Sequence, residues 1–150
     1  MKNNLEHSKD LKTDHAKAYF SLISLADRIE LRVKDSLKSI QLTHVQLNVL
    51  SILFQSSPHT QCISDLKPKL TVNSPDLSRL ITRLYDKGLI HRETSKSNRR
   101  KTSISITKKG VITFLKAHSL AKQSVNNFFI DDLKQSEAKQ LHNLLEKINL

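Results

Sequence analysis

The sequence contains few of the residues on which several classes of protein depend. Among its 150 residues are two glycines, three prolines and one cysteine, and tryptophan is absent. The single cysteine, Cys62, excludes an internal disulfide and indicates a reducing, cytoplasmic setting. No apolar run approaches the ~20 residues that span a bilayer, and the polar start lacks the apolar segment of a signal peptide. We therefore expect one cytoplasmic domain with no membrane partner.

The sequence also lacks the short motifs that mark common enzymes and metal sites. It contains no Gly-x-Ser-x-Gly, no phosphate loop and no dinucleotide loop, and its seven histidines form no His-x-x-x-His pair. We expect no enzyme, no cofactor and no metal. His44 and His118 could converge between the second helix and the long C-terminal helix, but we expect that they do not. Cys62 is expected to be a buried structural thiol, with a redox sensor as the alternative.

The sequence is rich in positive charge. Lys and Arg number 25 against 14 Asp and Glu, which gives a formal net charge of +11. A basic surface attracts polyanions through electrostatic steering and counterion release, so the charge favours a nucleic-acid partner. Aromatic residues make up only 5%, so the sequence does not predict a stacking pocket for a ligand.

Hydrophobic periodicity predicts helices at both ends of the chain. From 11 to 40 there is no Gly or Pro, and apolar residues recur every three or four positions. Thr43 is a candidate N-cap for a buried helix that starts at His44, and Thr107 for a long helix with Gly110 in its first turn. A short helix is expected over Ser64–Leu70, with Pro68 early in it, and a last helix over Ser136–Ile148.

The stretch TVNSPDLSRLITRLYDKGLI predicts a helix over residues 75–87. Ser74 can act as its N-cap, Pro75 suits the first helical position and Gly88 suits the left-handed residue after the helix. Opposite its leucine face lie small, hydrogen-bonding and basic residues, namely Pro75, Ser78, Arg79 and Thr82, with Arg83 at the edge. Such a face suits the major groove, where arginine can donate two hydrogen bonds to guanine. An ordinary amphipathic surface helix has the same pattern, so the neighbouring elements decide between the two interpretations.

Two alternating segments, Leu89–Glu93 and Thr102–Ile106, follow this helix and predict a hairpin. The tip, residues 94–101, is basic and contains Lys96, Arg99, Arg100 and Lys101. Beside a groove-reading helix, the two arginines would enter the minor groove or contact phosphates, and the lysines would add general attraction. The alternative is a solvated turn that charge keeps soluble. A helix pair followed by a charged hairpin is the winged helix-turn-helix plan.

Four stretches, LTHVQLNVLSIL, LSRLITRLYDKGLIHR, NRR and SITKKG, resemble the MarR-type (multiple antibiotic resistance regulator) transcription factors. The resemblance implies a mainly α fold with a small β-hairpin wing (α+β), in one domain of residues 1–150. Residues 42–110 would be the winged helix-turn-helix region, and 9–40 and 111–150 would be helices of a dimerisation body. It also implies a homodimer that binds a palindromic operator in double-stranded DNA, usually as a repressor.

The resemblance also implies roles for particular residues. It places Ser78 and Arg79 at the contact sites of the recognition helix, and Arg99 and Arg100 at the basic pair of the wing. Asn98 stands where the family usually has an aspartate that holds the wing through an ion pair. Many members respond to a small, often phenolic effector in a crevice between the dimer body and the reading head, but the sequence identifies no such molecule. The aromatic pair Tyr19 and Phe20 could line that crevice, and dimer core is the expected alternative.

Three functional hypotheses follow. The first is a dimeric, sequence-specific DNA-binding regulator. The second is a protein-interaction module on the same fold that binds another regulator rather than DNA. The third is an enzyme, for which the sequence shows no catalytic constellation.

Overall fold

The computed structural model is mainly helical, and it describes residues 13–70, 76–94, 102–130 and 132–149. Its helices are α2 (Asp14–Leu37), α3 (His44–Gln55), α4 (Leu77–Asp86), α5 (Lys108–Phe129) and α6 (Gln135–Asn149). Its strands are β1 (Thr60–Cys62), β2 (Ile90–Thr94) and β3 (Thr102–Ile106), which form one antiparallel sheet in the order β1–β3–β2. The predicted fold class, mainly α with a small β-hairpin, is confirmed.

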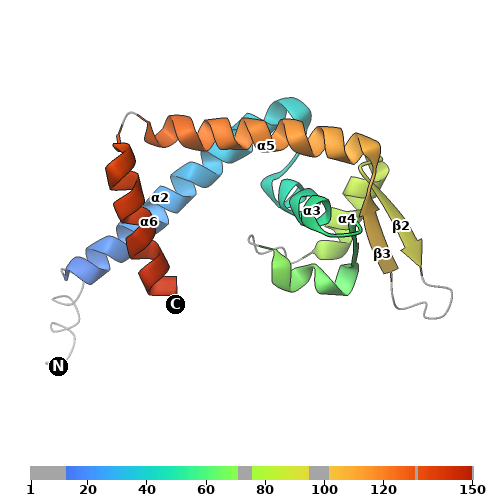
Figure 1. Ribbon diagram of the computed structural model, residues 1–150, viewed down its shortest axis with the longest axis horizontal. Helices are drawn as coiled ribbons and strands as arrows, with labels where there is room; N and C mark the ends of the chain where they lie inside the picture. The colour runs from blue at the N-terminus through green and yellow to red at the C-terminus, as the bar shows by residue number, and fades with distance from the viewer. Residues whose placement is uncertain (1–12, 71–75, 95–101, 131, 150) are drawn as a thin grey trace, which may run out of the picture.

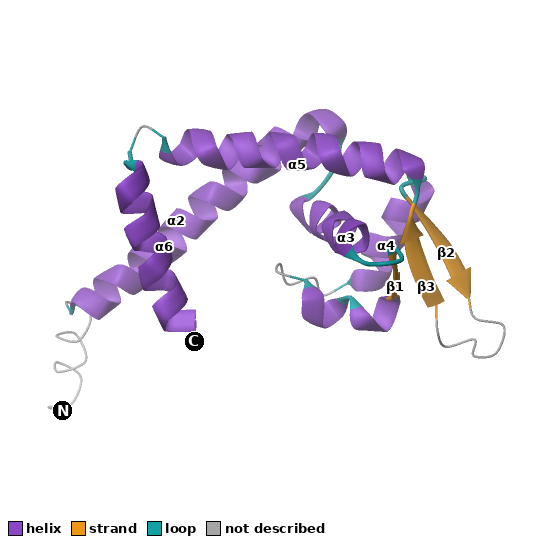
Figure 2. Cartoon of the chain, in the orientation of Figure 1, coloured by secondary structure: helices purple, strands orange, loops and turns teal. Residues whose placement is uncertain are grey.

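The elements are arranged as an arch (Figure 1). Helix α5 forms the span, and its first turn stands on a head made of α3, α4 and the sheet. At the far end of α5 the chain turns into α6, which lies beside the first half of α2. The sheet is confined to the head, and the rest of the arch is helical (Figure 2).

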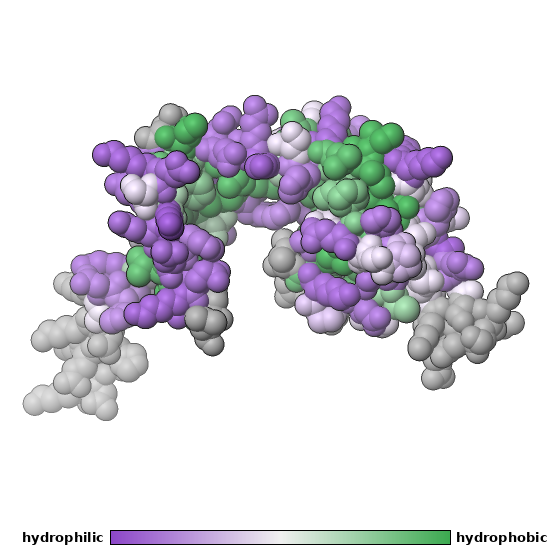
Figure 3. Space-filling model, in the orientation of Figure 1, coloured by the Kyte–Doolittle hydropathy of each residue, from purple (hydrophilic) through white to green (hydrophobic). Residues whose placement is uncertain are grey.

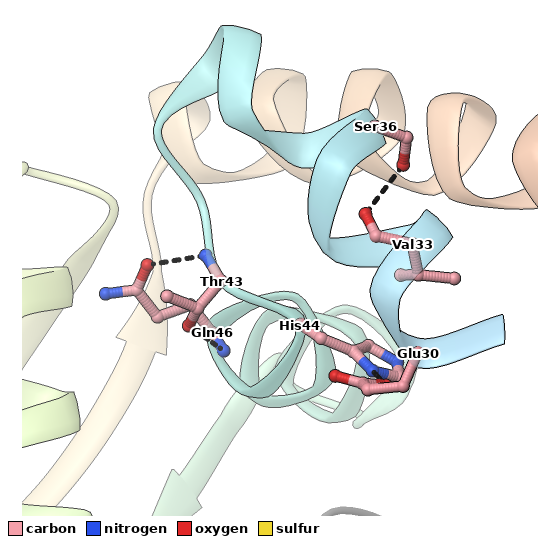
Figure 4. A network of polar contacts seen from close by, with 6 residues as sticks. All are labelled: Glu30, Val33, Ser36, Thr43, His44 and Gln46. Atoms are coloured by element: carbon pink, nitrogen blue, oxygen red, sulfur yellow. Dashed lines mark hydrogen bonds and ion pairs between the residues drawn. The ribbon is translucent and has the colours of Figure 1, made fainter. Parts of the chain in front are cut away.

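Threonine side chains cap the starts of three helices. The Thr43 hydroxyl accepts the Gln46 N–H at 3.2 Å, and the Gln46 side chain accepts the Thr43 N–H at 3.1 Å, which is a capping box (Figure 4). Thr107 accepts the Gly110 N–H at 2.9 Å at the start of α5, and Thr13 caps α2 in the same way. The predicted caps at Thr43 and Thr107 are confirmed.

The first long helix ends earlier than predicted. Helix α2 stops at Leu37, a 3-10 turn follows over Lys38–Ile40, and Gln41 takes a left-handed conformation with φ 53°. Val33 and Leu37, at the end of α2, are buried in the core beside α5. A left-handed residue cannot continue a right-handed helix, so the chain changes direction at Gln41 and enters α3.

The short helix predicted over Ser64–Leu70 is wrong as an α-helix. The chain instead forms two 3-10 turns, Ile63–Asp65 and Lys67–Lys69, around the fully buried Leu66. Pro68 has no N–H to donate to the carbonyl four residues before it, which interrupts the α-helical hydrogen-bond ladder. The segment still connects the sheet to α4, as a helix-turn-helix requires.

Strand β1 was not predicted. It pairs with β3 in a register that joins Thr60 to Ser105 and Cys62 to Ser103. Cys62 is therefore held on an edge strand and is half-buried, so the expectation of a buried thiol is wrong. A three-residue strand carries too little alternation to be recognised, and its partner lies some forty residues away in the sequence.

Gly110 makes the joint between the head and α5 possible. A Cβ placed on Gly110 would lie 2.1 Å from the Leu89 carbonyl oxygen and 2.8 Å from Cγ1 of Ile106. Only a residue without a side chain allows the first turn of α5 to approach the start of the hairpin this closely. One of the two glycines in the chain therefore lies at a position where a side chain would clash with the backbone.

Helix α6 starts one residue before the predicted Ser136. The Glu137 carboxylate accepts the Lys134 N–H at 2.8 Å, and the Glu137 N–H donates to the Lys134 carbonyl at 3.0 Å, so the two residues close the first turn. No side chain described on α6 is buried, although Leu141, Leu144, Leu145 and Ile148 form an apolar stripe. Within the described part of the chain, no helix is long and apolar enough to cross a bilayer.

Candidate nucleic-acid interface

Helix α4 is fixed to the head by its apolar face. Leu80, Ile81 and Leu84 are 8%, 1% and 0% exposed, and they belong to the same core as the inner face of α3. Burial of each such side chain contributes ~1.5–3 kcal/mol, so the orientation of α4 about its own axis is strongly determined. The packing of this apolar face therefore also determines which residues of α4 face the solvent.

The outward face of α4 carries the predicted contact residues. Ser78, Arg79, Thr82 and Arg83 are all exposed, and they share the solvent side with Tyr85 and Asp86. At ~100° per residue they lie opposite the leucine face. The structure thus brings four of the predicted site residues onto one accessible surface.

The start of α4 corrects the sequence interpretation. The N-cap is Asp76, whose side chain accepts the Arg79 N–H at 3.0 Å, and the helix begins at Leu77 rather than at Pro75. The predicted cap, Ser74, and Pro75 lie outside the described residues. Aspartate is as good an N-cap as serine, and its charge also favours the positive end of the helix.

The same aspartate contacts the side chain of Arg79. Arg79 Nε lies 3.2 Å from Asp76 Oδ2, and the two side chains are 81% and 50% exposed. Sequence analysis did not include Asp76 among the site residues. The three-residue spacing between an N-cap acid and an arginine was the available signal.

The far end of α4 is joined to the hairpin and to α5. Gly88 has φ 68°, as predicted for the residue that ends the helix, and Leu89 N–H donates to the Leu84 carbonyl at 3.0 Å. Thr107 Oγ1 donates to the Gly88 carbonyl at 2.9 Å, and Lys109 Nζ donates to that of Lys87 at 2.7 Å. The end of α4, the start of the hairpin and the start of α5 are therefore joined by hydrogen bonds at one place.

The hairpin next to α4 is formed by β2 and β3. Their register pairs Ile90 with Ile106 and Thr94 with Thr102. The basic tip predicted as the wing, with Lys96, Asn98, Arg99, Arg100 and Lys101, lies outside the described residues. Arg92, exposed on β2 between the joint and the tip, is a further cation that sequence analysis did not select.

An open hollow of about 590 Å³ lies between α2, α3 and α5. Both His44 and His118 line it, which sequence analysis did not expect, and His44 Nδ1 is paired with Glu30 Oε2 at 2.5 Å (Figure 4). In the ranges that the structure describes, no three His, Cys, Asp or Glu side chains come together as metal ligands do. Tyr19 and Phe20 are exposed elsewhere on α2 and do not line this hollow.

The buried helix α3, the 3-10 turns over residues 63–69, the outward basic helix α4 and the hairpin joined to it define a winged helix-turn-helix. This is the fold of a large class of DNA-binding transcription regulators. Comparison with known proteins gives the family. The MarR family model matches residues 42–102. An HTH-type transcriptional regulator of Bacillus cereus (strain ATCC 10987), itself uncharacterized, is 32% identical over 133 residues, which cover 87% of this chain and 86% of the relative.

Solved structures of MarR family regulators have a similar fold. AbsC, a MarR family transcriptional regulator from Streptomyces coelicolor, has a TM-score of 0.77 at 26% identity, over 91% of this chain and 93% of AbsC. Sco3205, a MarR family regulator from the same organism solved in complex with DNA, has a TM-score of 0.77 at 20% identity, over 91% of this chain and 87% of Sco3205. The chain belongs to the MarR family of DNA-binding transcriptional regulators.

Proposed function

We propose that this regulator acts as a homodimer on a palindromic operator in double-stranded DNA, probing the major groove with α4 and the minor groove with the wing, residues 94–101. The observation that carries the proposal is the outward face of α4, where Ser78, Arg79, Thr82 and Arg83 are exposed opposite a fully packed apolar face. Arginine forks and short hydroxyl side chains are the groups that read base edges and phosphates in the major groove.

The proposed role of the wing rests on the position of the hairpin beside α4. Strands β2 and β3 extend from the end of α4 and lead to the basic tip. Arg99 and Arg100 would then reach the minor groove or its phosphates beside the groove that α4 enters, with Lys96 and Lys101 adding attraction. Asn98 would hold the wing by hydrogen bonds, since it lacks the charge for an ion pair.

Dimerisation is supported by the apolar surface of the arch. Figure 3 shows apolar atoms below α5, between α6 and the head. Tyr19, Phe20 and Ile23 on α2, and Leu144 and Ile148 on α6, are between 48% and 73% exposed. An amphipathic helix whose apolar stripe is left uncovered requires a partner. A second copy, related by a twofold axis, would cover these stripes and place two α4 helices about 34 Å apart on one side of the duplex.

Repression and response to an effector complete the proposal. A dimer seated on an operator would compete with transcription for the same DNA. The hollow between α2, α3 and α5 lies between the arch and the reading head, so we propose it as the place for a small-molecule effector of unknown identity.

The test is selection of binding sites from random duplex DNA by the full chain, followed by sedimentation of the free protein and of its complex. We expect a twofold-symmetric consensus bound by two chains. The alternative, a protein-interaction module, predicts no consensus and an affinity no better than the nonspecific ~10⁻⁴ to 10⁻⁶ M.

A further inference from the structure

Asp76 binds two different groups of the same residue. One carboxylate oxygen, Oδ1, accepts the backbone N–H of Arg79 at 3.0 Å, and the other, Oδ2, forms an ion pair with the side chain, 3.2 Å from Nε. The first contact caps α4. The second does nothing for the backbone and connects the carboxylate only to the guanidinium, which is otherwise 81% exposed.

The ion pair with Asp76 at Nε leaves the outer edge of the Arg79 guanidinium, with Nη1 and Nη2, available to a ligand. The group is planar and has five N–H donors in a fixed fork, so holding Nε sets the plane of the whole group. Among the residues that the structure describes, Asp76 is the ion-pair partner of Arg79. The Nη1 and Nη2 donors at the outer edge match the O6 and N7 acceptors of guanine.

The charge of Asp76 has a second consequence. The N-terminus of a helix is a natural phosphate site, because its free N–H groups and its dipole attract anions. Asp76 occupies that position on α4 with a carboxylate and would repel a phosphate there. In a chain with a net charge of +11, this lowers the attraction to DNA of any sequence at the helix that is to read bases.

We propose that Asp76 is a positioning residue that sets the selectivity of α4: it orients Arg79 for two hydrogen bonds to one guanine and weakens binding to DNA in general. The inference rests on the proposed function of α4 as the recognition helix. A purely capping role is the competing explanation, and it predicts loss of stability without loss of selectivity.

Two substitutions separate these roles. Asp76→Ser keeps a hydroxyl that caps the helix but removes the second acceptor and the charge. Asp76→Asn keeps one acceptor for the cap, and its neutral amide NH₂ cannot form the ion pair with Arg79. Both variants, Arg79→Ala and the double variant Asp76→Ser/Arg79→Ala are made in the full chain. Urea unfolding is measured first, and then affinity for the selected consensus, for consensus sites changed at single base pairs, and for unrelated duplex DNA.

We expect the Ser and Asn variants to remain folded and to keep the cap, with only a small loss of stability from the missing charge at the positive end of the helix. Each should discriminate about tenfold less at the one G·C pair that Arg79 reads, because that discrimination depends on the bidentate contact. Each should also bind unrelated DNA more tightly, with a salt slope steeper by up to about one unit. Arg79→Ala should lose discrimination at the same base pair, and adding Asp76→Ser to it should remove no more.

Other results would overturn the inference. Unchanged discrimination in both Asp76 variants, with discrimination lost in Arg79→Ala, would reduce Asp76 to a cap. Discrimination unchanged in Arg79→Ala would remove the residue on which Asp76 is said to act. Both results leave the wild type a specific DNA-binding protein, whereas a wild type with no consensus at all would defeat the proposed function together with the inference.

Discussion

His44 Nδ1 lies 2.5 Å from Glu30 Oε2, so the first residue of α3 is paired with α2 in the lining of the hollow that these helices share with α5 (Figure 4). The pair joins the reading head to a helix of the arch. The two side chains are 29% and 48% exposed, so water and salt screen their attraction.

Replacing Glu30 with Gln should therefore lower the free energy of unfolding by less than about 1 kcal/mol. Urea unfolding at low and high salt checks this, and the difference from the wild type should shrink as salt rises. Asp14→Asn is the matched control, because it removes an exposed carboxylate paired with Lys17 on the same helix. A large loss that salt does not alter would show that Glu30 does more than pair with His44.

Gly110→Ala should destabilise the head strongly. The new methyl group would lie 2.1 Å from the Leu89 carbonyl oxygen, so either the hairpin or α5 must move. Such overpacking typically costs ~1–3 kcal/mol, and the backbone contact here favours the upper end. The measurement is chemical unfolding, with Ser119→Ala at an exposed position of the same helix as control. Equal stability of the two variants would contradict the close approach.

Gly88→Ala tests the end of α4 separately. The left-handed φ of 68° costs a residue with a side chain roughly 1–2 kcal/mol, and there is open space around the position apart from Lys109 Nζ at 3.9 Å. Gly88→Asn should lose less, since asparagine tolerates this conformation better than alanine. Unfolding experiments that ranked Ala above Asn in stability would argue against backbone strain as the cause.

Replacing Arg99 and Arg100 with Ala should weaken binding to every DNA sequence by a similar factor. Each lost phosphate contact removes about 0.9 from the slope of log K against log salt, so the pair should flatten it by up to about 1.8. Titrations at several salt concentrations measure this. The control, Lys116→Ala with Lys139→Ala, removes the same charge from exposed positions on α5 and α6. Full affinity in the arginine variant would remove the wing from the proposed interface.

Leu144→Ser with Ile148→Ser should shift the protein from dimer to monomer. Both side chains are more than half exposed on α6 and line a hollow of about 620 Å³ against α2, which a second chain would fill. Sedimentation across a range of concentrations should show a weaker dimer, and operator affinity should fall with it. Gln140→Ala, on the exposed side of α6, should change neither. A dimer of undiminished strength would place the interface elsewhere.

Local signals explain what the sequence could predict. Thr43, Thr107 and Gly88 each act on backbone groups within a few residues, so their roles could be read from the chain alone. The outward position of Arg79 followed from the helical period in the same way.

The missed features depend on contacts between distant segments or on a choice between neighbours. Strand β1 exists because β3 offers it a partner, and no pattern within Thr60–Cys62 requires that pairing. Ser74 and Asp76 are both good caps, and only the folded chain shows that Asp76 occupies the position. The pairing of His44 with Glu30 likewise depends on how α2 crosses α3.

The close contact at Gly110 couples the orientation of α5 to that of the head. Helix α5 is continuous from Lys108 to Phe129, and its first turn packs directly against Leu89. A tilt of its far end would therefore be transmitted to its first turn. The hairpin and the end of α4 would move with that first turn, because hydrogen bonds join them to it. The spacing of two such heads along a duplex would then be adjusted by whatever moves the opposite end of α5.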